Sequence, residues 1–145
     1  MFSSTLRRWL VLGAVCAFCG CGEPKPDWKS TYPVTGRVLV DGEPAENLAV
    51  YCISLSAPDK EHPTRSECLT HKDGTFEIGT YLSNDGVPEG EYALTFQWGE
   101  IGGISFRYEG DKLNGRYTDP KNSPVKFTVE AGEPTDLGTI ELTTK

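Results

Sequence analysis

The sequence predicts an all-β domain, a seven-stranded antiparallel β-sandwich with Greek-key connections. Short runs that alternate apolar and polar residues recur along the chain, and turn-forming residues separate them. The 145 residues include 16 glycines and 10 prolines, which suit turns and short strands better than helices. No stretch of the body has the i, i+3, i+4, i+7 spacing of an amphipathic helix. A chain of this length is expected to form one domain with a substantial core.

Residues 1–20 have the three parts of a secretory signal peptide. Arg7 and Arg8 form the positive region, residues 9–18 form the apolar region, and small residues follow. As a helix, residues 9–18 would rise about 15 Å, which is half of a hydrocarbon core of about 30 Å. We therefore expect an export signal rather than a membrane span.

The export signal ends in Phe18-Cys19-Gly20-Cys21. This motif resembles the lipobox of bacterial lipoproteins, in which a small residue precedes an invariant cysteine. The resemblance implies cleavage before Cys21 and attachment of diacylglycerol to its sulfur, and several acyl chains anchor a protein stably. In Gram-negative lipoproteins, an aspartate directly after the lipidated cysteine favours retention in the inner membrane. Gly22 occupies this position, so we expect the protein in the outer membrane, facing the periplasm. The alternative is a plain secreted protein that is cleaved elsewhere.

Residues 21–31 are predicted to be the lipidated N-terminus and an extended tether, because they are polar and contain two prolines. Trp28 and Tyr32 are the large side chains of this region, and we expect them to dock on the edge of the domain. The domain itself is predicted at residues 32–145. Its expected strands are a first one within residues 33–42 that runs into an Asp-Gly turn, then 48–55, the two arms of a hairpin within 65–80, and 90–98, 125–130 and 137–142.

The hairpin is centred on Asp73-Gly74, a dipeptide that accepts the positive φ angles of a tight turn. A run of period two precedes the turn and another follows it, which predicts two paired strands. The expected role of the hairpin is to fix strand register and to bring Cys68 to Cys52. Its inward row is predicted to comprise Cys68, Thr70, Phe76 and Ile78.

Four motifs in this order resemble carboxypeptidase-regulatory-like, or transthyretin-like, domains. They are Val34-Thr35-Gly36-Arg37-Val38, Asp41-Gly42-Glu43-Pro44-Ala45, Thr70-His71-Lys72-Asp73-Gly74-Thr75-Phe76 and Pro88-Glu89-Gly90-Glu91-Tyr92. The resemblance spans about residues 32–142 and implies a transthyretin-like sandwich. It implies little about function, because the motifs consist of turn chemistry and strand pattern. The hydroxyisourate-hydrolysing branch of this fold ends in Tyr-Arg-Gly-Ser, whereas this chain ends in Leu-Thr-Thr-Lys.

Cys52 and Cys68 are the cysteines that remain after export, and an oxidising compartment favours a disulfide between them. The alternation of their strands places both side chains inward. The alternative is a pair of buried free thiols. A redox-active pair is disfavoured, since such pairs usually occur as Cys-x-x-Cys at a helix N-terminus.

We expect no metal, no cofactor and no catalytic residues, although the sequence leaves open whether calcium binds to the carboxylates of the turns. The possible zinc ligands Cys52, His62, Cys68 and His71 lack the close spacing of structural zinc sites. Gly-x-Ser-x-Gly and His-Glu-x-x-His are both absent from the sequence. Four aspartates are each directly adjacent to a glycine or a proline, and we expect them to cap turns. They are Asp73, Asp85, Asp111 and Asp119.

The best candidate for binding is the segment 99–117, because loops longer than about 12–15 residues are often binding elements. Its aromatic and hydrogen-bonding groups would suit a sugar or a peptide. The proposed ligand-binding residues are Trp98, Phe106, Arg107, Tyr108, Arg116 and Tyr117. The structural alternative makes residues 104–106 an extra edge strand and has Leu113 and Tyr117 cap the core.

The sequence thus predicts a lipid-anchored, non-enzymatic structural or binding module of the bacterial envelope. Its partners would be the membrane and a cell-envelope glycan or protein. Nucleic acid is excluded, because the net charge is −7 and most basic residues are scattered singly. The alternatives are a carbohydrate- or peptide-binding lipoprotein that uses residues 99–117, and a small hydrolase with a pocket that joins His62 or His71 to a nucleophile. Oligomeric state stays open.

Overall fold

The structure is a computed structural model that describes residues 27–57, 60, 63–102 and 107–145. The predicted signal peptide and Cys21 lie outside these residues. No helix among the described residues is long and apolar enough to cross a membrane. In chain order the elements are β1 (Val34–Val40), β2 (Glu43–Pro44), β3 (Ala49–Ser54), β4 (Ser66–Leu69), β5 (Thr75–Glu77), β6 (Gly90–Gln97), β7 (Glu100–Gly102), β8 (Arg107–Glu109), the 3₁₀ turn η1 (Pro120–Asn122), β9 (Lys126–Val129) and β10 (Thr135–Leu142).

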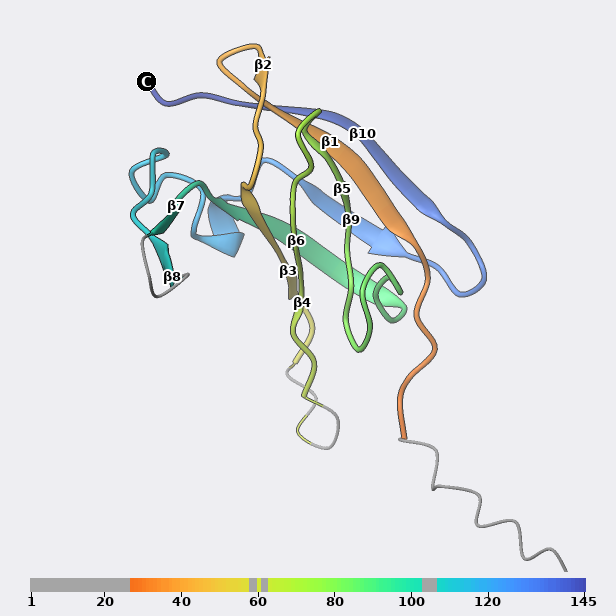
Figure 1. The fold of residues 1–145 in the computed structure, drawn as a ribbon. Helices are drawn as coiled ribbons and strands as arrows, with labels where there is room; N and C mark the ends of the chain where they lie inside the picture. The colour runs from red at the N-terminus through yellow and green to blue at the C-terminus, as the bar shows by residue number, and fades with distance from the viewer. Residues whose placement is uncertain (1–26, 58–59, 61–62, 103–106) are drawn as a thin grey trace, which may run out of the picture.

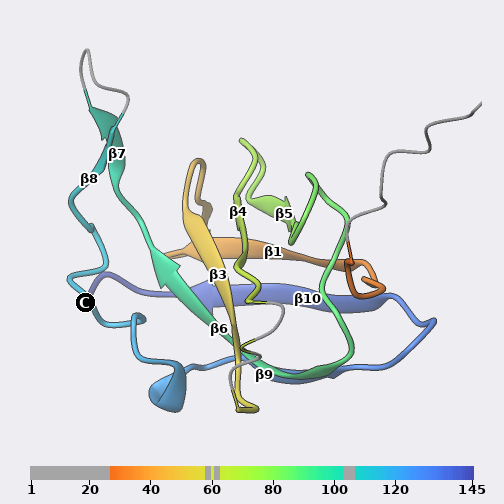
Figure 2. The same ribbon diagram turned by 90° about the horizontal axis from the view of Figure 1, so that it is seen from below.

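Two four-stranded sheets pack face to face, which confirms the predicted β-sandwich (Figures 1 and 2). One sheet has the order β10-β1-β2, with β5 also paired to β1, and the other has the order β4-β3-β6-β9. The seven predicted strands correspond to β1, β3, β4, β5, β6, β9 and β10. The short strands β2, β7 and β8 were not predicted, and β7 and β8 form a separate hairpin.

The prediction of a wholly antiparallel sandwich is wrong for one pair of strands. β1 and β10 run parallel, with Val34 opposite Thr135 and Val40 opposite Leu142. Turn residues indicate how neighbouring strands connect, but they carry no information about strands that lie a domain length apart. The register shifts between Thr35 and Arg37, beside Phe76. A Cβ on the intervening Gly36 would lie 2.7 Å from Cζ of Phe76, so this bulge needs glycine.

The segment around Asp73-Gly74 turns as predicted, but its arms pair only at one isolated antiparallel bridge, between Glu67 and Gly79, and do not form a continuous two-stranded ladder. Gly74 has a φ of 81°, and its N–H donates to the carbonyl of His71 at 2.9 Å. β4 pairs with β3, whereas β5 pairs with β1 in the other sheet. The turn therefore carries the chain from one sheet to the other. The inward row was predicted correctly, since Thr70, Phe76 and Ile78 are buried and Cys68 is half-buried.

The core fills the space between the sheets with side chains from both. Its largest fully buried members are Phe76, Phe96, Leu48, Ile78, Leu94 and Leu113. The predicted alternation of β6 places Leu94 and Phe96 in this core, and Tyr92 is 7% exposed. Burying an aliphatic or aromatic side chain of this size stabilises the fold by about 1.5–3 kcal/mol. These residues therefore account for much of the driving force for folding.

Thr70 joins the two segments that cross between the sheets. Its N–H donates to the carbonyl of Leu48 at 2.9 Å, and its carbonyl accepts from the N–H of Asn47 at 3.0 Å. Its hydroxyl accepts from the N–H of Leu48 at 2.9 Å and donates to the carbonyl of Ala45. Thr70 is 2% exposed, so these groups have no access to water. One buried residue thus satisfies the polar backbone of the β2–β3 crossing.

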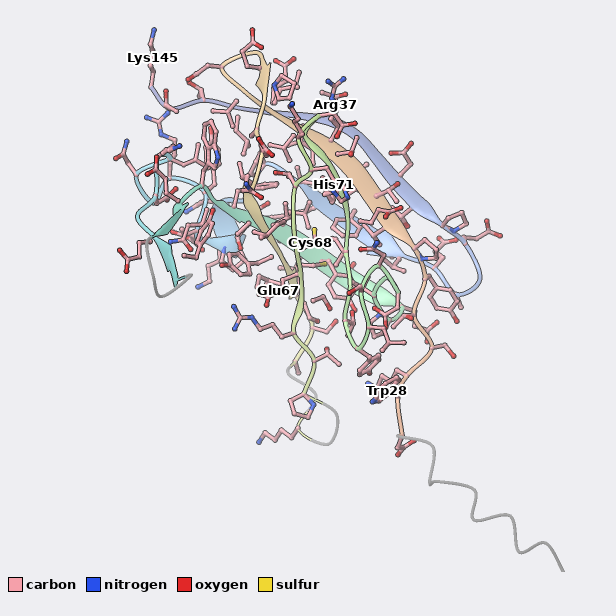
Figure 3. All side chains as sticks on the ribbon, viewed as in Figure 1. Trp28, Arg37, Glu67, Cys68, His71 and Lys145 are labelled. Atoms are coloured by element: carbon pink, nitrogen blue, oxygen red, sulfur yellow. The ribbon has the colours of Figure 1, made fainter. Side chains whose placement is uncertain are left out.

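The end of the predicted tether and the residue that follows it dock on the domain, as expected for Trp28 and Tyr32. The Trp28 ring stacks on Tyr81 with centroids 5.0 Å apart and planes 5° apart. The Lys29 N–H donates to the Tyr81 hydroxyl at 3.2 Å. Tyr32 exchanges two backbone hydrogen bonds with Val87, at 2.8 and 3.0 Å. We call the end of the sandwich where Trp28 docks the tether end; Lys145 lies at the opposite end (Figure 3).

Candidate functional site

The segment after β6 forms the β7–β8 hairpin, which stands away from the two sheets (Figure 2). Trp98 at its base is partly buried against the core. Its indole Nε1 donates to the carbonyl of Glu46 at 3.0 Å. The Lys112 ammonium lies 4.8 Å from the centroid of the indole ring, a cation–π contact that covers one face. Trp98 is therefore engaged with the domain on its edge and on one face.

Tyr108 fastens the hairpin to the sandwich through its hydroxyl. The oxygen accepts a hydrogen bond from the N–H of Gly99, and the carbonyls of Gln97 and Asn47 lie 2.7 and 3.1 Å away as acceptors. Burial raises the pKa of Tyr108 above its usual value. A hydroxyl with its hydrogen-bonding capacity used in this way has little left for a ligand.

The base of the hairpin is closed by Asp111. Its carboxylate accepts hydrogen bonds from the N–H groups of Trp98, Leu113 and Gly115, at 2.8–2.9 Å. Leu113 is fully buried below this turn. The ring of Tyr117 packs edge-on against Phe96, and its hydroxyl accepts from the N–H of Thr143 at 3.1 Å. The structural alternative for Leu113 and Tyr117 is confirmed.

Of the six proposed ligand-binding residues, the structure describes the side chains of four. Trp98, Tyr108 and Tyr117 hold the segment in place through the contacts described above. Arg116 is exposed at the surface. Phe106 lies outside the described residues, as does the edge strand expected at 104–106. Arg107 belongs to β8, and its side chain lies outside the description.

All four turn aspartates cap backbone groups, as predicted. Asp85 accepts from the N–H groups of Thr80, Tyr81 and Leu82, at 2.6–3.1 Å. Asp73 accepts from the N–H and hydroxyl of Thr75, and these bonds hold the pKa of Asp73 below its usual value. Asp119 caps η1, and Asp111 closes the turn described above. Among the described residues, no group of three or more His, Cys, Asp or Glu side chains is placed to hold a metal ion.

Cys52 and Cys68 are free thiols in the structure, so the predicted disulfide is not present. The strand register gives the reason. Val50 lies opposite Cys68, and Cys52 lies opposite Ser66, so the two cysteines are diagonal neighbours on one face. Diagonal positions lie about 7–8 Å apart, farther than the Cβ separation of about 3.8 Å that a disulfide needs. Burial raises the pKa of Cys68 to about 12 and also raises that of Cys52, which leaves both thiols protonated and unreactive.

The hydrolase alternative needs a pocket that joins a histidine to a nucleophile. His62 lies outside the described residues. His71 is exposed and, with Arg37 and Glu77, lines a shallow depression of about 530 Å³ over β1 and β5. This depression is open to solvent, whereas pockets for small molecules bury most of the ligand surface. The geometry therefore gives little support to hydrolysis at His71.

A groove that the sequence did not reveal runs between the end of β3 and the start of β4. It encloses about 430 Å³ and reaches Lys29 and the segment Pro88–Gly90. At its rim the Arg65 guanidinium lies 5.5 Å from the centroid of the Tyr51 ring. Deeper in the groove the Tyr92 hydroxyl donates to the carbonyl of Pro88 at 2.9 Å, and burial raises the pKa of Tyr92 to about 12. The only sequence signal for this groove is the outward alternation of Tyr51, which is common in strands.

No family model matches the chain, and no curated protein matches it. Among solved structures it is similar to (S)-allantoin synthase, with 21% identity over 80% of this chain and 42% of that chain and a TM-score of 0.42. A 5-hydroxyisourate hydrolase of Klebsiella pneumoniae has 15% identity over 80% of this chain and 90% of its own, with a TM-score of 0.37. A DUF3823 family protein of Parabacteroides merdae has 16% identity over 80% of this chain and 46% of its own, with a TM-score of 0.37. Likenesses this distant assign no activity to the chain.

The structural role of Tyr108 predicts the effect of removing its hydroxyl. Tyr108→Phe keeps the ring but leaves the Gly99 N–H without its partner, which costs about 1–3 kcal/mol where that group is buried. We expect faster hydrogen exchange at Gly99 and a lower urea midpoint. Arg116→Ala is the matched control, because Arg116 is exposed, and it should leave both measurements unchanged. Equal behaviour of the two variants would contradict a structural role for Tyr108.

Proposed function

We propose that the protein is a lipid-anchored component of the bacterial envelope whose β-sandwich acts as a non-enzymatic structural or binding module. The observation that carries this proposal is the docking of the segment that follows Cys21. The stack of Trp28 on Tyr81 and the two backbone bonds of Tyr32 fix the point at which the tether leaves the domain. A fixed exit point suits a domain that is held at a membrane by its N-terminus.

The use of polar groups supports a non-enzymatic role. The turn carboxylates cap backbone N–H groups, and the hydroxyls of Thr70 and Thr80 donate to backbone carbonyls. Both thiols of the domain have raised pKa values, so neither is an activated nucleophile. These carboxylates and hydroxyls of the described residues are thus employed in holding the fold.

Binding of a carbohydrate or peptide is the second candidate function, and the β3–β4 groove supports it better than residues 99–117 do. The aromatic side chains Trp98, Tyr108 and Tyr117 are already engaged with the domain. Tyr51 and Arg65 instead form the rim of a groove of about 430 Å³, which is within the usual size range of ligand sites. An aromatic ring beside a guanidinium offers both a stacking surface and hydrogen-bond donors.

The anchoring part of the proposal is tested by substitution at the lipobox. Cys21→Ser should abolish both radiolabelling by fatty acid and recovery of the protein in the membrane fraction, because the serine hydroxyl does not replace the thiol as acyl acceptor. Cys19→Ser is the matched control, since Cys19 would be removed with the signal peptide, and it should keep both properties. Continued labelling of the Cys21→Ser protein would refute the assignment.

The binding part is tested by a screen of glycans, peptidoglycan fragments and peptides against residues 21–145. If a ligand is found, Tyr51→Ala should weaken its binding at least about tenfold, as the loss of a buried aromatic contact typically does. Arg116→Ala should leave the affinity unchanged. The reverse result would assign binding to residues 99–117. The absence of any ligand would favour a purely structural role.

A further inference from the structure

Large apolar side chains are exposed mainly at the tether end. The five that the structure shows are Trp28 (49% exposed), Ile53 (38%), Leu55 (45%), Leu69 (43%) and Leu82 (61%). Trp28 stacks on Tyr81, which directly precedes Leu82. Leu69 is the exception, because it lies opposite Ala49 at the start of β3, at the other end of the sandwich.

The exposed residues at the end of β3 belong to the same end of the molecule. Lys29, the neighbour of Trp28, lines the β3–β4 groove together with Ser54 and Ser56, which flank Leu55. Ile53 lines this groove as well. Four of the five exposed apolar side chains therefore gather around the point at which the chain leaves the domain towards Cys21.

We propose that the tether end rests on the lipid surface, with Trp28 and Leu82 inserted at the level of the headgroups. This inference rests on the proposed function, because it requires the acyl chains on Cys21. Seven residue steps separate Cys21 from Trp28, and they span at most about 25 Å in any conformation. The tether end is thus kept within reach of the membrane. β3 and β10 extend from the tether end to the opposite end of the domain, so the opposite end is farther from the lipid.

The side chains at this end have the chemistry of a membrane interface. Tryptophan and tyrosine prefer the headgroup level, where the ring is buried and the polar atom is hydrated. Leu82 adds apolar area next to the Trp28–Tyr81 stack. The lining of the β3–β4 groove contains two basic residues, Lys29 and Arg65, and one acidic residue, Glu89. The whole chain, in contrast, has a net charge of −7. Because Arg65 pairs with the Glu67 carboxylate at 2.7 Å, the proposed lipid contact depends on the aromatic and apolar side chains rather than on charge.

Leu82 is presented on a turn of defined shape. The Asp85 carboxylate accepts from the N–H groups of Thr80, Tyr81 and Leu82, which fixes the backbone of this turn. A preformed turn loses little conformational entropy when it meets a surface. The anchor makes this contact intramolecular, so a weak interaction is enough to orient the domain. An isolated domain without acyl chains would not need to bind membranes by itself.

The two tryptophans of the mature chain allow a direct test. Trp28 lies at the tether end, whereas Trp98 contacts Glu46 at the other end of β3. Single-tryptophan proteins, Trp98→Phe and Trp28→Phe, are purified with their native acyl chains and reconstituted into phosphatidylcholine vesicles with brominated acyl chains. We expect quenching of Trp28 fluorescence to exceed that of Trp98 by about twofold or more. Bromine on an acyl chain quenches only an indole that lies close to it, and of the two only Trp28 would be at the membrane interface.

A second pair of variants separates insertion from simple proximity. In the Trp98→Phe background, Leu82→Glu should reduce the quenching of Trp28 towards the Trp98 value, because a carboxylate opposes insertion at the interface. Leu69→Glu is the matched control and should leave the quenching unchanged. Both positions are exposed, so both variants are expected to fold.

Flotation of the vesicles distinguishes the two ways in which the proposal can fail. Protein that does not float with the vesicles has no anchor, which overturns the proposed function and this inference with it. Protein that floats but shows equal quenching of Trp28 and Trp98 overturns the inference alone. The same holds if Leu82→Glu leaves the quenching of Trp28 unchanged.

Discussion

The arrangement of the two sheets depends on the buried polar contacts of Thr70. The chain crosses between the sheets twice in neighbouring segments, once before β3 and once after β4, and each crossing carries buried peptide groups away from its ladders. The backbone and hydroxyl of Thr70 bond to Ala45, Asn47 and Leu48, and so hold the two crossings side by side. Each buried peptide group without a partner would cost about 1–3 kcal/mol, which is comparable to what the burial of one large apolar side chain contributes. The junction therefore lets the core close at this edge.

The same crossing also receives the segment after β6. The carbonyl of Glu46 accepts from the Trp98 indole, and that of Asn47 lies within reach of the Tyr108 hydroxyl. The aromatic side chains Trp98 and Tyr108 are thus committed to the fold, and four of the five exposed large apolar side chains of the described residues lie at the tether end instead. Under the proposed function, the lipid anchor on Cys21 would orient the β-sandwich relative to the membrane. The β3–β4 groove lies at the same tether end, so the candidate ligand site and the proposed lipid contact use one end of the domain.

Sequence reasoning found the features that depend on local chemistry. The seven main strands, the turn aspartates and the inward faces all follow from period-two alternation and from the conformational needs of turns. The parallel pairing of β1 with β10 and the separation of β4 from β5 depend on which strands meet across the domain, which local patterns do not record. The prediction of a disulfide was wrong for a related reason. Alternation predicted the correct face for Cys68 but not the register of its strand against that of Cys52. Residues 99–117 contain residue types that are common in binding sites. The hydrogen bonds that Tyr108 in this segment makes to backbone carbonyls elsewhere in the chain could not be predicted from the sequence.

The claim that Thr70 holds the crossings together is tested most directly by urea unfolding of Thr70→Val. Valine keeps the shape of the side chain but leaves the Leu48 N–H and the Ala45 carbonyl without their side-chain partner. We predict a loss of about 2–3 kcal/mol in the free energy of unfolding. Thr128→Val, at an exposed position of β9, is the control and should stay within about 0.5 kcal/mol of the wild type. A Thr70→Val protein as stable as the control would contradict the account.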